Sequence, residues 1–155
     1  MKPRVEIDKL FDMYETFSKG YIKQIAKDSG TRLVRRISGR RDNQYVIDFI
    51  TVFCGCISRI NGYPYAEYEF FKEVTGINTV SYDEYKRMTE INGNDATLME
   101  MKVYSETVYF DISFDCDLMF LGLCMCAFDG KVSNREREHM IQYVPMPSYT
   151  DNRRL

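Results

Sequence analysis

Two carboxylates in the C-terminal third of the chain have the type and spacing that could hold a cation. Asp129 lies directly before Gly130, and Glu136 follows seven residues after Asp129. Carboxylate oxygens are the ligands that Ca²⁺ and Mg²⁺ prefer. The same residues have a structural interpretation, in which Asp129 shapes a turn and Glu136 completes a capping box with Ser133. Both interpretations place a turn at Asp129-Gly130 and a helix start at Ser133.

A divalent cation bound at this turn would be held weakly. The residues at the earlier ligand positions of a calcium-binding loop are Met125 and Ala127, which cannot coordinate calcium. We therefore expect water or a third carboxylate, such as Asp48 or Glu67, to complete any site that the two carboxylates begin.

A basic segment lies between residues 32 and 41. Its arginines are Arg32, Arg35, Arg36, Arg40 and Arg41. Guanidinium groups bind phosphate and acidic partners, so the alternative function is a nucleic-acid- or phosphate-associated protein. The segment lacks the interleaved aromatic residues of single-strand binders, and the net charge of the chain is −2. A solvated surface, or pairing with acidic helices of the same chain, is the other interpretation, and nucleic acid is not the partner we expect.

Aromatic residues gather directly after Asn61-Gly62, in the sequence YPYAEYEFF at residues 63–71. Core and rim packing is one interpretation. The other is an exposed patch for a protein partner, because tyrosine is enriched at interfaces. The residues we assign to such a patch are Tyr63, Tyr65 and Tyr68.

Five cysteines and one histidine complete the reactive side chains. Residues i and i+2 of a helix point about 200° apart, so the pairs Cys54/Cys56 and Cys124/Cys126 cannot each grip one ion. We expect reduced, buried thiols in a cytoplasmic protein. His139 has no nucleophile beside it in sequence, and the chain has no phosphate-loop, dinucleotide or H-E-x-x-H motif. We therefore expect no enzymatic activity and no catalytic residues.

Amphipathic periodicity and capping residues predict a helical protein. Val46, Phe49, Ile50 and Phe53 fall on one face of a helix, and Asn61-Gly62 provides a turn after it. The same criteria predict helices at 5–17, 43–60, 65–75, 81–91, 97–111, 114–128 and 134–143, with a short helical turn at 21–28. Segment 97–111 is also rich in strand-forming residues, but a single strand would have no partner in this chain.

The turn at Asp129-Gly130 has a fainter copy at Asn61-Gly62, at an offset of 68 residues. An apolar helix precedes each turn and another helix follows it, so two such units can pack around one core. The motif Asp129-Gly130-x-Val132-Ser133-x-x-Glu136 resembles the tellurite-resistance TerB family. The first copy keeps Gly62 and departs from the motif at Asn61, Pro64, Tyr65 and Tyr68.

The resemblance implies an all-α fold, a TerB-like helical bundle built from two related helix–turn–helix halves. It implies a non-enzymatic interaction or scaffold component in a tellurite-resistance, stress-response or phage-defence context, with another protein as partner. It also implies acidic residues near the turns that hold a divalent cation, here Asp129 and Glu136. The oligomeric state stays open.

Composition and segment character set the expected domain organisation. Hydrophobic content of 45% and charged content of 28% are ordinary for a globular protein. The longest apolar run, 118–128, is too short to cross a bilayer, which takes roughly 20 residues, and the N-terminus lacks the apolar region of a signal peptide. We divide the chain into an N-terminal helical segment with a basic linker at 1–41, a TerB-like helical domain at 42–144 and a flexible tail at 145–155.

Overall fold

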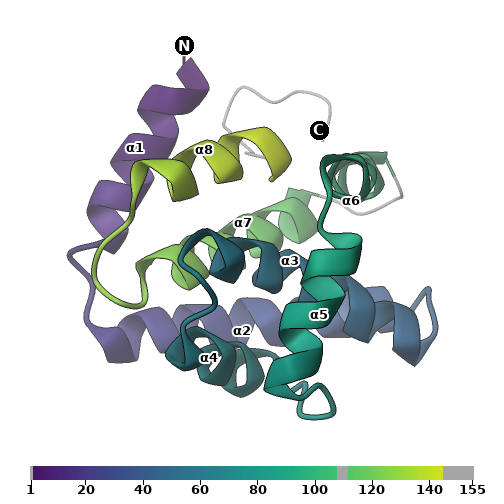
Figure 1. Cartoon of the computed structure of the whole chain (residues 1–155). Coiled ribbons are helices and arrows are strands. Elements are labelled where there is room, and N and C mark those ends of the chain that lie inside the picture. The colour runs from purple at the N-terminus through teal and green to yellow at the C-terminus, as the bar shows by residue number, and fades with distance from the viewer. Residues whose placement is uncertain (1, 108–111, 145–155) are drawn as a thin grey trace.

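The computed structural model describes residues 2–107 and 112–144, and these form an all-helical bundle without strands (Figure 1). The prediction of an all-α fold is confirmed. The described helices are α1 (Lys2–Tyr14), α2 (Lys19–Ser38), α3 (Asn43–Ile60), α4 (Tyr65–Thr75), α5 (Tyr82–Asn92), α6 (Asp95–Thr107), α7 (Ile112–Ala127) and α8 (Asn134–Tyr143). The expected helix at 97–111 is confirmed over 97–107, whereas residues 108–111 and the expected tail at 145–155 lie outside the described residues.

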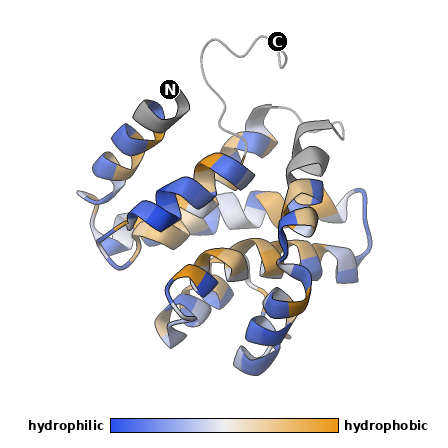
Figure 2. Cartoon of the chain, turned by 45° about the horizontal axis from the view of Figure 1, so that its top comes forward, coloured by the Kyte–Doolittle hydropathy of each residue, from blue (hydrophilic) through white to orange (hydrophobic). Residues whose placement is uncertain are grey.

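The two most apolar helices, α3 and α7, supply the centre of the bundle. α7 buries Leu118, Leu121 and Leu123 on different sides of the helix, as expected for a helix that is apolar all round. Orange, apolar residues accordingly concentrate on the inner helices in Figure 2, and blue residues face outward on the helices around them. Within the described residues, no helix combines the length and apolarity that crossing a membrane requires.

Helix α2 joins two segments that the sequence predicts separately: the expected helical turn at 21–28 and the basic segment at 32–41, interpreted as a linker or a short surface helix, form one continuous helix that ends at Ser38. Its buried face is made by Ile22, Ala26, Leu33 and Ile37, which supply the apolar stripe that a surface helix needs. Arg32 and Arg35 lie on the exposed side of the same helix, whereas Arg36 is half-buried and Arg40 and Arg41 follow the helix end.

Close contact between α2 and α4 depends on Gly30. A Cβ added there would lie 2.6 Å from the backbone oxygen of Val74, so only glycine permits this approach. Phe11 of α1 and Leu33 of α2 belong to the same hydrophobic core as Phe71 of α4. Residues before and after position 41 therefore share one core.

Candidate functional site

The two turns singled out from the sequence lie against each other in the structure. Asn61, which ends α3, donates from Nδ2 to Oε2 of Glu67 at 3.1 Å and to Oε2 of Glu136 at 3.2 Å. Glu67 lies in the first turn of α4 and Glu136 in the first turn of α8. One amide group therefore bridges two carboxylates that are 69 residues apart in the chain.

Both bridged carboxylates are inside the protein, since the exposed fraction is 1% for each. Burial above all raises the pKa of Glu67 to about 7, and the charges of Glu136 and Asp129 add to the rise. The hydrogen bond from Asn61 and the nearby Ser58 hydroxyl oppose it. Oε1 of Glu67 accepts no hydrogen bond of ordinary geometry. Burial is also the main cause that raises the pKa of Glu136.

Both hydrogen bonds of the predicted capping box between Ser133 and Glu136 are present. Oε1 of Glu136 accepts from the Ser133 N–H at 2.9 Å, and the Ser133 hydroxyl accepts from the Glu136 N–H at 3.2 Å. Asp129 is exposed and accepts from the Lys131 N–H at 3.1 Å, which shapes the turn. In the part of the chain that the structure describes, no three or more His, Cys, Asp or Glu residues are grouped to hold a metal ion. The geometry adds no support to a cation on Asp129 and Glu136.

Asn61 and Glu67 are the functional candidates that sequence reasoning undervalued. The sequence predicts Asn61 only as a turn residue and Glu67 only as a third carboxylate. The signal was the alignment of the two turns, since an amide in place of the aspartate supplies a donor where two acids converge.

The tyrosines after Asn61 have three different environments. Tyr65 is exposed, and its ring packs edge-on against Tyr82 with centroids 5.0 Å apart. Tyr68 is buried and donates its hydroxyl to the Val80 carbonyl at 2.6 Å. Tyr63 is half-buried and donates to Glu90 at 2.8 Å. Only Tyr65 of the three offers most of its ring to a partner.

The arginines do not form one phosphate site. Arg32 makes a bidentate ion pair with the buried Asp117 of α7, with Nε and Nη2 both within 3.0 Å of its oxygens. The guanidinium of Arg41 lies over the Tyr45 ring, 5.3 Å from its centroid. Arg35 is exposed on α2, as is Arg40 beyond the helix end, whereas Arg36 is half-buried. The positive charge is therefore distributed over separate contacts.

Four of the five thiols are buried core residues, and Cys116 is half-buried. Burial raises the pKa of Cys56 to about 11 and raises the pKa of Cys54 and Cys124 further. A thiol that stays protonated at neutral pH is a poor nucleophile. Burial and the charge of Arg59 lower the pKa of His139 to about 4, so this imidazole is neutral at pH 7.

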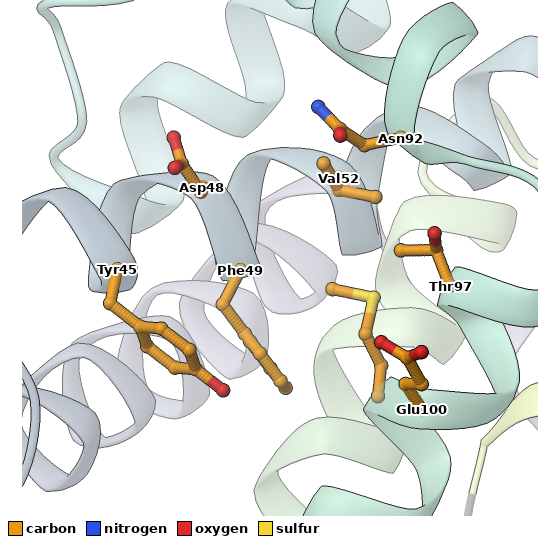
Figure 3. Close-up of a pocket in the computed structure, with 8 residues that line it drawn as sticks. Tyr45, Asp48, Phe49, Val52, Asn92, Thr97 and Glu100 are labelled. Carbon is orange, nitrogen blue, oxygen red and sulfur yellow. The ribbon is translucent and has the colours of Figure 1, made fainter.

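An open groove of about 430 Å³ lies between α3, α5 and α6 (Figure 3). α3 contributes Phe49 and Val52, whereas α6 contributes Met101. Two carboxylates line opposite walls, Asp48 from α3 and Glu100 from α6. The remaining lining residues are Tyr45, Asn92 and Thr97. This groove combines an apolar surface with acidic groups on both sides.

Comparison with known proteins returned no match. No protein-family model, no curated protein and no solved structure matches the chain.

Proposed function

We propose that the chain is a non-catalytic protein-interaction module that holds a segment of another protein in the groove between α3, α5 and α6. The observation that carries the proposal is the composition of this groove. Half-buried Tyr45 and Met101 supply its apolar and aromatic contact area, next to the buried Phe49 and Val52, and tyrosine and methionine are enriched at interface cores.

The charges of the groove indicate which segment it would take. Asp48 is half-buried and its Oδ1 accepts from the Gln44 amide at 2.8 Å, so this carboxylate is oriented. Glu100 is exposed on the opposite wall. A segment with an apolar side chain next to a lysine or arginine would bring the cation to one of these carboxylates, where a charge-assisted hydrogen bond forms.

Helices α3 and α5, which both line the groove, cross closely. Gly55 of α3 faces the side chain of Thr89 of α5, with no room for a Cβ between them. A groove on rigid helices loses little conformational entropy when it binds, which favours affinity. The TerB-like resemblance of the second turn implies the same class of function, so a tellurite-resistance, stress-response or phage-defence context is part of the proposal.

Site-specific photo-crosslinking in cells tests the proposal. A photoreactive residue at Thr97, inside the groove, is expected to trap one protein segment that contains a lysine or arginine. The matched control carries the same group at Asp83, a side chain that is 95% exposed on α5. Glu100→Lys should abolish the crosslink at position 97. Trapping of the same proteins from position 83, or a crosslink that survives Glu100→Lys, would contradict the proposal.

A further inference from the structure

The outward side of α2 carries a stripe of residues at helical spacing that differs in chemistry from end to end. Its members are Tyr21, Ile25, Asp28, Arg32 and Arg35. The spacing of four and three residues places them on one face. We propose that two copies of the chain associate through this face, with their α2 helices antiparallel.

The N-terminal half of the stripe borders an aromatic trough of about 440 Å³ between α1, α2 and α7. Its apolar lining residues are Met13, Tyr14, Phe17, Tyr21, Ile25 and Phe120. Met13 is 47% exposed and Tyr21 is 54% exposed. Phe17 packs edge-on against Tyr21 with ring centroids 4.8 Å apart, so the exposed ring is supported. Exposed aromatic and methionine side chains of this kind are characteristic of protein interfaces.

The C-terminal half of the stripe is basic. The guanidinium of Arg32 is fixed by its two-point contact with Asp117, yet its side chain remains 46% exposed. Arg35 is exposed one turn further along, and it forms no ion pair with any residue that the structure describes. Arginines with a fixed or accessible guanidinium stack on aromatic rings and pair with carboxylates.

An antiparallel pairing about a two-fold axis on the outward side of α2, level with residue 30 along the helix, brings opposite chemistries together. Asp28 then faces Arg32 of the second copy, and Ile25 faces Arg35 of the second copy, since the residue numbers in each pair add to the same value. Arg35 also comes within reach of the Tyr21 ring of the second copy, which lies one helical turn beyond Ile25. The two-fold axis repeats every contact, as in the isologous dimers that dominate soluble oligomers. A parallel pairing would instead oppose arginine to arginine.

A second copy of the chain fits this face because the two halves of the stripe are complementary in chemistry. The aromatic rings of one half, with the exposed carboxylate of Asp28 that also accepts from Gln24 at 2.9 Å, can contact a cation, and the other half of the same helix presents two. A 20-residue helix such as α2 extends about 30 Å, and the Met13, Phe17 and Phe120 side chains widen the contact beyond the helix. The net charge of −2 gives little repulsion between copies.

Sedimentation equilibrium of the full chain over a wide concentration range tests the proposal. The wild type is expected to dimerise, and Tyr21→Ala should weaken the dimer on the order of tenfold or more. Tyr65→Ala removes an equally exposed tyrosine on α4 and should leave the dimer unchanged. A monomer at all concentrations, or a dimer that Tyr21→Ala does not weaken, would overturn the proposal.

Crosslinking fixes the helix pairing. Asp28→Cys should join two copies through a short bismaleimide, because position 28 faces its counterpart within about one helical turn. Lys27→Cys is the matched control, since one residue along a helix turns the side chain by about 100°. Equal crosslinking from both positions, above the background of the native cysteines, would show that the copies meet elsewhere.

Discussion

Replacing Glu67 by glutamine should stabilise the protein at neutral and alkaline pH. Glu67 is 1% exposed, and burial raises its pKa to about 7. The ionised form is therefore disfavoured in the folded state, and no cation is hydrogen-bonded to it among the described residues. Glutamine keeps the size of the side chain and an oxygen that accepts from Asn61, but it carries no charge.

The size of the effect follows from the pKa. The rise from 4.5 to about 7 corresponds to about 3 kcal/mol, at 1.36 kcal/mol for each tenfold change in proton affinity. That value is an upper bound, because the carboxylate pair with Glu136 titrates jointly. We expect Glu67→Gln to raise the free energy of unfolding by about 2 kcal/mol at pH 8.

The sign of the pH dependence is fixed by the direction of the shift. Between pH 4.5 and about 7 the folded state holds a proton on Glu67 that the unfolded state has lost. The stability of the wild type therefore falls as pH rises through this window and loses nothing more from Glu67 above it. Below pH 4.5 both states are protonated, so the wild type and the glutamine variant should converge.

Urea denaturation followed by far-ultraviolet circular dichroism at pH 4, 6 and 8 measures this difference. The matched control is Glu69→Gln, an exposed glutamate on the same helix, which should change stability by less than about 0.5 kcal/mol. A Glu67→Gln variant that is less stable than the wild type at pH 8, or a difference that does not vary with pH, would refute the reasoning.

Three further predictions concern single contacts. Gly30→Ala places a methyl group 2.6 Å from a backbone oxygen of α4 and should lower the free energy of unfolding by about 2 kcal/mol or more. Gly20→Ala, with open space around it, should not destabilise the protein, and equal melting temperatures for the two variants would contradict this packing. Ser133→Ala removes a helix cap and should cost about 1 kcal/mol in urea denaturation, and an unchanged midpoint would exclude the capping role. Arg32→Ala leaves Asp117 buried without its bidentate partner and should lower the free energy of unfolding by about 1–3 kcal/mol. Adding Asp117→Asn should recover part of this loss, and no recovery would show that the ion pair is not the source of the lost stability.

Helix boundaries were predictable from the sequence wherever local chemistry determined them. The bounds of α3, α4 and α8 agree with the predicted ranges 43–60, 65–75 and 134–143, because Asp42, Gly76 and Ser133 fix helix ends through short-range hydrogen bonds and backbone conformation. No residue beyond the immediate neighbours needs to be known for these assignments.

The length of α2 was not predictable in the same way. Gly30 lowers the local helix propensity, and only the backbone of α4 explains the glycine. Likewise, sequence alone could not show that Tyr68 turns into the core while Tyr65, three residues earlier, faces outward. Packing between distant segments determines these features.

The same limit applies to the acidic site, where spacing alone could not decide how the carboxylates are used. An aspartate on a turn with a glutamate one helical turn inside is common to ion-binding loops and to capping boxes. In this chain each oxygen of Glu136 already accepts a hydrogen bond, one from Ser133 and one from Asn61. Asparagine at position 61 adds a donor rather than a third acid, and among the described residues no positive side chain hydrogen-bonds to Glu67. A proton is therefore the simplest means of neutralising the buried charge, and a pKa of about 7 for Glu67 makes that proton exchangeable near neutral pH.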